Sequence, residues 1–183
     1  MTSESGKHAG TPVTLEQMLT ARDQRAERQQ TALADFGLPI ASLGAVMPGP
    51  IKDNAQSRII LSAAIESLDA LFAQKRWPVR YFVPIFAATG PEALYVVDTD
   101  ARDLKRALVD LEDSHPLGRL WDLDVISPTQ GILSRRAFGL PPRRCLVCGA
   151  EAHACARSQK HALPQLFDVI EQKVAAYRHD SET

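Results

Sequence analysis

Residues 118–126 read GRLWDLDVI, a run in which apolar and acidic side chains alternate. In a β-strand, successive side chains point to opposite faces of the sheet. We therefore expect the tryptophan, the leucine and the valine of this run to face a hydrophobic core. Asp122 and Asp124 would then project from the other face, about 7 Å apart. Aspartate is depleted in strands, so the pair indicates either a functional site or, as the plainer alternative, solvated side chains on a half-exposed edge strand.

The segments around this strand indicate an α+β protein. Apolar residues that recur every three or four positions, together with capping residues, predict helices over residues 14–37, 55–75, 100–114 and 163–174. β-rich runs predict further strands over residues 38–49, 79–88, 92–98 and 131–140. Several of these strands are adjacent in sequence. The expected architecture is a single mixed or antiparallel sheet that helices cover, mostly on one face.

The composition indicates one globular domain. Of the 183 residues, 45% are hydrophobic and 23% are charged, as in ordinary soluble proteins. We expect the domain to span residues 14–178, between a disordered tail at residues 1–13 and a short tail at residues 179–183. The net charge of -1 argues against a general attraction to nucleic acid or to an anionic membrane. The sequence has neither a secretory signal nor an apolar run of about 20 residues, so we expect a cytoplasmic protein.

The acidic strand is a candidate magnesium site. Two carboxylates on one face of a strand can converge on one Mg²⁺, which usually takes one or two carboxylates together with substrate phosphates. The preceding residues, HPLGR, would add backbone donors near Gly118 and the positive charge of Arg119. His115 is a candidate general base, because an ordinary histidine titrates near neutral pH. Its alternative role is that of a cap at a helix C-terminus.

Basic residues gather near this strand in the sequence. Arginine has a planar, forked guanidinium group that suits phosphate oxygens. The arginines that are candidates for phosphate binding are Arg119, Arg135, Arg136, Arg143 and Arg144. Because neighbours along a strand face opposite ways, we expect one arginine of each adjacent pair to face the site. Lys52 follows a glycine-containing turn and is a further candidate, with an ordinary surface position as its alternative.

All three cysteines lie in RRCLVCGAEAHACARSQKH, residues 143–161. Four possible ligands for a tetrahedral Zn²⁺ follow a C-x2-C-x6-C-x5-H spacing, namely Cys145, Cys148, Cys155 and His161. A second interpretation takes Cys145, Cys148 and His153, as in a zinc knuckle, but it leaves Ser158 at the fourth position. Packed thiols without a metal are the remaining alternative, because free cysteine behaves as a small hydrophobe. Three clustered cysteines do not predict a disulfide framework in a reducing compartment.

Two motifs together give a family resemblance. HPLGRLWDLDV, followed by GLPPRRCLVCGAEAHACARSQKH, resembles the citrate lyase holo-acyl-carrier-protein synthases, which are also called apo-citrate lyase phosphoribosyl-dephospho-CoA transferases. The resemblance covers roughly residues 14–176. It implies that the phosphoribosyl-dephospho-CoA part of 2'-(5''-triphosphoribosyl)-3'-dephospho-CoA is transferred to a serine of the acyl-carrier subunit of citrate lyase. Pyrophosphate leaves in that reaction.

Such a nucleotidyl transfer needs positioning and the neutralisation of phosphate charge, which Mg²⁺ at Asp122 and Asp124 would serve. Polymerase-type nucleotidyltransferases use a similar carboxylate pair, so a nucleotidyltransferase-like fold is expected by analogy. The sequence lacks a clear glycine–serine signature and an identifiable third carboxylate. Two other interpretations stay open. One is a zinc-stabilised binding module without catalysis, and the other is the same transfer onto the carrier protein of another lyase or of a decarboxylase.

Overall fold

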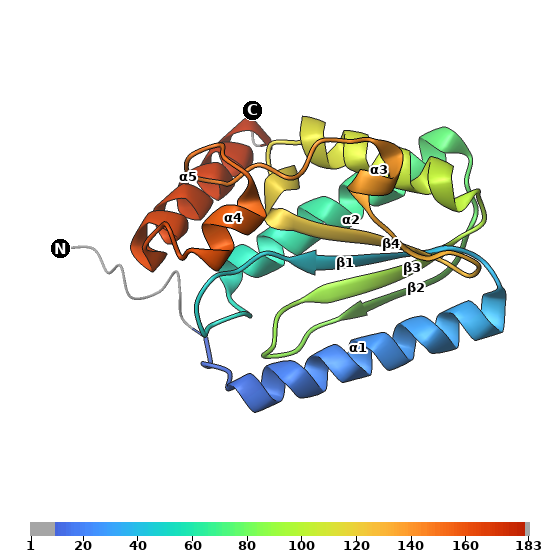
Figure 1. Cartoon of the computed structure of the whole chain (residues 1–183), viewed down its shortest axis with the longest axis horizontal. Helices are drawn as coiled ribbons and strands as arrows, with labels where there is room; N and C mark the ends of the chain where they lie inside the picture. The colour runs from blue at the N-terminus through green and yellow to red at the C-terminus, as the bar shows by residue number, and fades with distance from the viewer. Residues whose placement is uncertain (1–9, 182–183) are drawn as a thin grey trace.

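A five-stranded antiparallel sheet forms the centre of the protein (Figure 1). The computed structural model describes residues 10–181, so the predicted tail residues 1–9 and 182–183 lie outside the described part. The strands are β1 (Ile40–Ala45), β2 (Val79–Ile85), β3 (Glu92–Val97), β4 (Trp121–Ser127) and β5 (Gly131–Leu133). They lie in the order β2-β3-β1-β4-β5, and each neighbouring pair is antiparallel. The predicted α+β class with a single sheet is confirmed.

Helices cover both faces of this sheet (Figure 1). The helices are α1 (Leu15–Phe36), α2 (Ala55–Lys75), α3 (Ala101–Ser114), α4 (Ala152–Arg157) and α5 (Leu163–Ser181), with short 3₁₀ helices η2 (Gly118–Leu120) and η3 (Arg135–Phe138). α2, α3 and α5 pack on one face and enclose the main core. α1 crosses the other face, where a smaller apolar cluster forms around Ala32 and Ile40. Within residues 10–181, every helix is too short or too polar to cross a membrane.

Capping residues fix the helix ends where the sequence predicted them. The side chain of Thr14 accepts from the N–H of Gln17 at 3.2 Å, and the side chain of Gln17 accepts from the N–H of Thr14 at 2.8 Å. Gly37 ends α1 in the left-handed conformation, with a φ of 63°. Asp100 caps α3 by accepting from the backbone N–H groups two and three residues later.

The main core confirms the alternation in β4. Trp121 is fully buried, and its Nε1–H donates to the carbonyl oxygen of Ile60 in α2 at 3.1 Å. Leu123 and Val125 are buried in the same cluster. The two aspartates between them are exposed on the opposite face. β4 therefore has an exposed pair of aspartates on one face, while the residues of its other face are buried.

The predicted strand over residues 131–140 is too long. β5 ends at Leu133, and η3 follows it. Ser134 turns the chain because its side chain accepts a hydrogen bond from the N–H of Ala137 at 3.3 Å. Gly139 ends this turn with a φ of 67°. The strand alternation expected for the two arginines of η3 therefore does not apply.

Contacts and helical structure reach close to both ends of the described residues. The N–H of Val13 donates to the carbonyl oxygen of Pro50 at 2.9 Å, so contacts with the domain begin before residue 14. At the other end, α5 continues through Ser181. This helix is longer than the predicted helix over residues 163–174.

Gly118 lies where the chain leaves α3, and its packing generates a prediction about stability. A Cβ at this position would lie 2.1 Å from the backbone oxygen of Glu112, which cannot move without displacing α3. We predict that Gly118→Ala lowers the free energy of unfolding by about 3 kcal/mol, as measured by chemical denaturation. Gly44→Ala is the control, because a Cβ there would meet nothing within 4 Å. Equal stability of the two variants would contradict the packing described for Gly118.

Candidate active site and metal centre

The two predicted aspartates project from one exposed face of β4. In the sheet register, Asp122 lies opposite Gly44 of β1 and Asp124 lies opposite Ser42. This is the face that α1 crosses, away from the core around Trp121. Gly44 has no side chain, and a Cβ at that position would meet none of the described residues within 4 Å. The surface of the sheet beside Asp122 is therefore open to a ligand.

Asp124 is influenced by its neighbour and by a lysine. Solvent reaches its side chain, yet the surrounding protein partly desolvates the carboxyl and raises its pKa above the ordinary 3.8. The negative charge of Asp122 raises this pKa further, and the charge of Lys105 opposes the shift. Lys105 extends from α3 and donates to the carbonyl oxygen of Leu123 at 3.3 Å. The two carboxylates thus repel each other, a condition that a shared cation would relieve.

A network of ion pairs joins β4 to α3. Arg143 donates to Asp122 at 2.8 Å and also pairs with Glu112 of α3. Glu112 is buried and pairs through its other oxygen with Arg135 at 2.9 Å. Burial raises the pKa of the Glu112 carboxyl, and the charges of Arg143 and Arg135 oppose that shift. Arg143, one of the predicted phosphate-binding arginines, thus lies beside the acidic strand, where it bridges the exposed carboxylate of Asp122 and the buried carboxylate of Glu112.

One arginine of each adjacent pair turns inward, although not for the predicted reason. Arg135 and Arg143 form the ion pairs of this network, whereas Arg136 and Arg144 are exposed. A 3₁₀ helix positions the first pair, and an isolated β-bridge of Arg144 positions the second. Arg119 donates to the carbonyl oxygen of Arg144, which ties the start of β4 to the cysteine segment.

A third carboxylate lies on the same face of the sheet, and the sequence analysis missed it. Glu92 begins β3 opposite Gly44, so a single glycine separates it from Asp122 across the sheet. Glu92 is buried and pairs with Arg25 and Arg28 of α1. The available signal was a glutamate at the head of the otherwise apolar run EALYVV. Its place beside the aspartates depends on the strand register, which the sequence alone does not reveal.

A cavity of about 820 Å³ opens between β4 and the cysteine segment. Three of its lining residues belong to the predicted phosphate and metal site, namely Arg119, Asp122 and Arg143. The remaining walls come from the residue after β1, from the cysteine segment and from the start of α5. The two motifs that are separate in the sequence therefore share one cavity.

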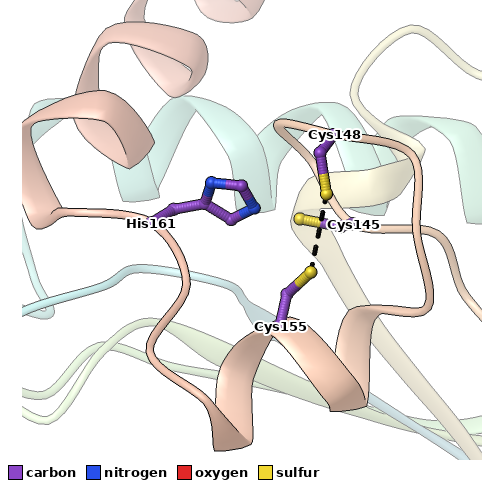
Figure 2. Close-up of side chains that lie close together, drawn as sticks. All are labelled: Cys145, Cys148, Cys155 and His161. Carbon is purple, nitrogen blue, oxygen red and sulfur yellow. Dashed lines mark hydrogen bonds between the residues drawn. The ribbon is translucent and has the colours of Figure 1, made fainter.

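The cysteine segment folds into the four-residue cluster that the first spacing predicted (Figure 2). The ligand atoms of Cys145, Cys148, Cys155 and His161 all lie within 4.8 Å of one another. The Sγ atoms of Cys148 and Cys155 are 3.5 Å apart, which is close to the spacing of two thiolates around one zinc with Zn–S bonds of about 2.3 Å. The Nε2 of His161 is buried without a hydrogen-bond partner in the described part of the chain. His153 is exposed and lies outside this cluster, so the fold does not assemble the zinc-knuckle set.

The thiols of this cluster differ in acidity. Burial acts to raise the pKa of Cys145, but hydrogen bonds from the backbone N–H groups of Cys148 and Val147 outweigh it and lower the pKa. Burial and the neighbouring thiols raise the pKa of Cys155 to about 11. Lys160 places its Nζ 3.9 Å from the Sγ of Cys148. The surroundings of Cys145 therefore favour a thiolate, the form of cysteine that binds metal ions.

His115 and Gly118 have structural partners that differ from their predicted roles. His115 ends α3 and stacks on Trp121, with 4.3 Å between the ring centroids, on the core side of β4. The N–H of Gly118 donates to the carbonyl oxygen of His115 at 2.9 Å, so it is not free for phosphate. This geometry supports neither a general base at His115 nor a phosphate donor at Gly118. The ring of His115 lies on the core side of β4, and the N–H of Gly118 already has an acceptor.

Lys52 also has a partner within the protein. Its Nζ donates to the carbonyl oxygen of Met47 at 2.6 Å, in the loop that follows β1. Burial lowers the pKa of the Lys52 ammonium group. This contact closes the loop on itself. It gives the Lys52 side chain a structural role that does not need a bound phosphate.

One cavity is lined by Asp122, by two arginines and by three residues of the Cys₃His cluster. Such a cavity has the parts of an enzyme that handles a charged substrate. Residues 13–177 match the family of apo-citrate lyase phosphoribosyl-dephospho-CoA transferases. Because this match covers nearly the whole chain, the protein belongs to that transferase family. The resemblance seen in the two sequence motifs is confirmed.

Curated relatives of the chain carry the same name. The apo-citrate lyase phosphoribosyl-dephospho-CoA transferases of Escherichia coli strain SMS-3-5 and of Escherichia coli O6:K15:H31 strain 536 are each 43% identical to it over 159 residues. The enzyme of that name from Shigella boydii serotype 18 is also 43% identical. Each similarity covers 87% of this chain and 87% of the relative.

The position of His115 predicts how stability depends on pH. Burial lowers the pKa of the imidazole below its ordinary 6.5, so just below that pH the unfolded chain binds a proton more readily than the folded protein. The stability that the neutral ring contributes is present above pH 6.5 and is lost as the pH falls through the folded-state pKa. His115→Asn keeps an acceptor for the N–H of Leu117. We predict that this variant loses less stability than the wild-type protein between about pH 7.5 and about pH 5 in urea denaturation.

The same variant separates a structural role of His115 from a catalytic one. Its place on the core side of β4 predicts that His115→Asn keeps transferase activity within about threefold of wild type, whereas removal of a general base costs about 100-fold or more. A loss of the larger size in a folded variant would return His115 to the catalytic site.

Proposed function

We propose that this protein attaches the phosphoribosyl-dephospho-CoA group to a serine of the acyl-carrier subunit of citrate lyase and releases pyrophosphate. Its family and the names of its relatives support this reaction. The observation that carries the proposal is the position of Asp122. This residue lies on the exposed face of β4, pairs with Arg143 and lines the 820 Å³ cavity.

The proposed reaction exchanges one bond at phosphorus. The serine oxygen forms a bond to the first phosphorus of the donor's triphosphate, the bond from that phosphorus to pyrophosphate breaks, and the serine proton is released. Enzymes speed such transfers mainly by positioning the reactants and by neutralising phosphate charge. Arg119 and Arg143 both line the cavity, and their guanidinium groups would pair with the phosphate oxygens.

Asp122 and Asp124 are the residues that would hold Mg²⁺. They offer oxygen ligands from one face of one strand, and the side chain of Asp122 is 51% exposed, which leaves room for phosphate and water on the same ion. When bound, Mg²⁺ would act as a Lewis acid that neutralises the phosphate charge. Glu92 has both carboxylate oxygens paired with arginines of α1, so we assign it to the attachment of that helix.

Substitution of the aspartates tests this site. We predict that Asp122→Asn and Asp124→Asn each lower the rate of carrier modification about 1,000-fold, while the protein stays folded because both carboxylates face solvent. Asp103→Asn is the control, since its side chain is 60% exposed on α3, and this variant should retain full activity. The measurement is the mass increase of purified apo-carrier in the presence of the donor. Wild-type turnover by Asp122→Asn would exclude the proposed metal site.

The same assay identifies the carrier. Apo-carrier subunits of citrate lyase and of a decarboxylase are supplied separately with a donor of known activity. We expect the citrate lyase subunit to be modified faster. Modification of the decarboxylase carrier alone would reassign the substrate, and modification of neither would favour a binding module without catalysis.

We also propose that the Cys₃His cluster of residues 145, 148, 155 and 161 binds a structural Zn²⁺. Three sulfur ligands and one nitrogen ligand form a closed tetrahedral set, which is typical of structural zinc sites. The convergence of the four ligand atoms supports this assignment. The buried Nε2 of His161, which has no hydrogen-bond partner among residues 10–181, supports it as well. The ion would hold the segment that carries Arg143 beside β4.

Metal analysis tests the zinc proposal. We predict about one zinc per chain in the purified protein, because the cluster offers a complete ligand set. His161→Ala and Cys148→Ser should lose the metal and lower the Tm by about 10 °C, since zinc binding contributes directly to folding. His153→Ala should keep both the metal and the Tm, because His153 is exposed outside the cluster. Loss of zinc from the His153 variant alone would instead support the zinc-knuckle set.

A further inference from the structure

The cavity beside Asp122 has several chemically different sets of lining residues, one of which is Cys145, Cys155 and His161 of the Cys₃His cluster. Arg119, Asp122 and Arg143 form a charged set. The aliphatic set is Val46, Leu146, Leu163 and Leu166. The volume of about 820 Å³ is that of a small-molecule site, since such pockets range from about 300 to 1,000 Å³. The cavity therefore suits a ligand that combines phosphate groups with an apolar body.

Leu163 is the part of the aliphatic set that internal packing leaves exposed, whereas Leu146 packs against the main core. Leu163 is the first residue of α5 and its side chain is 46% exposed, although it is large and apolar. An exposed leucine that faces a cavity offers surface whose burial by a ligand would be favourable. The surface of Leu163 is thus available to a flat or flexible apolar group.

Polar side chains accompany this wall. Gln159 and His153 both line the cavity. Gln159 follows α4 with a φ of 47°, a left-handed conformation that is uncommon for a residue other than glycine. Its side-chain amide offers a donor and an acceptor together, which is the combination that the edge of an adenine ring can match.

The proposed donor presents its parts in a fixed order. In 2'-(5''-triphosphoribosyl)-3'-dephospho-CoA, the ribose that carries the reacting triphosphate is joined to the 2' oxygen of the adenosine. The pantetheine arm begins farther away, beyond the diphosphate on the other side of that adenosine. When the reacting phosphorus lies at Asp122, the adenosine is therefore the nearest part of the donor that has an apolar face.

We infer that this cavity binds the adenosine part of the donor, with the purine ring against the aliphatic set and with Gln159 at its edge. The inference rests on the proposed function for the identity of the donor. It assigns recognition of the nucleoside to the cysteine segment and to the start of α5. Chemistry at phosphorus remains with the aspartates of β4.

Binding of dephospho-CoA to the full chain, measured by titration calorimetry, tests this inference without catalysis. Leu163→Glu places a carboxylate in the cavity at a helix N-terminus, where α5 tolerates negative charge. We expect this variant to raise the Kd about tenfold or more, since it replaces an apolar contact with a desolvated charge. Ile132→Glu in β5 is the matched control, because Ile132 is 68% exposed and is not part of the cavity lining. An unchanged Kd in folded Leu163→Glu would overturn the inference.

Competition identifies which part of the ligand occupies the cavity. ADP should displace dephospho-CoA from the wild-type chain and should bind Leu163→Glu more weakly, whereas pantetheine 4'-phosphate should not compete. Displacement by pantetheine 4'-phosphate alone would place the arm in the cavity and would overturn the inference. Failure of the proposed function looks different. If the protein binds dephospho-CoA in the expected manner but modifies no carrier, the result would contradict the proposed transfer reaction and would still support the nucleoside site.

Discussion

The burial of Trp121 is the constraint on which the rest of the structure depends. Its indole is fully buried and hydrogen-bonded to α2. These contacts fix which face of β4 points into the core. A shift of one residue would exchange the two faces of the strand and would bury two carboxylates without partners, which is strongly unfavourable. The packing of Trp121 in the core therefore fixes the two aspartates on the opposite face of the sheet.

The charged groups near β4 form two sets. One set is a framework of buried glutamates paired with arginines, and the other is the exposed pair Asp122 and Asp124. Two glutamates are buried in the described part of the chain, and each is held by two arginines: Glu112 by Arg135 and Arg143, and Glu92 by arginines of α1. The pairs of Glu92 attach α1 to β3, and the pairs of Glu112 attach α3 to η3 and to the cysteine segment. Asp122 belongs to both groups, since it shares Arg143 with the framework and is itself exposed. Arg143 therefore couples the conformation of the cysteine segment, where it lies, to the charge of Asp122 on the acidic face.

Much of this arrangement could be predicted because its signals are local in sequence. Caps such as Thr14 and Asp100 mark helix ends within a few residues, and the spacing of cysteines 145, 148 and 155 restricts which side chains can meet. Other features depend on contacts between distant segments. The position of Glu92 follows from the register of three strands, and the orientation of His115 follows from stacking on Trp121. The shortened β5 reflects a single side-chain hydrogen bond of Ser134, which competes with strand pairing.

The short β5 has a consequence for how this protein meets other chains. It pairs with β4 only from Val125 to Ser127, so no strand within residues 10–181 lies on the outer side of the half of β4 that carries the aspartates. An unprotected strand edge can recruit a strand from a second molecule and begin aggregation. The ammonium group of Lys105, which bonds to the carbonyl oxygen of Leu123, blocks this edge. The protein can thus keep a bare, polar sheet surface for its chemistry without offering a template to a neighbouring polypeptide.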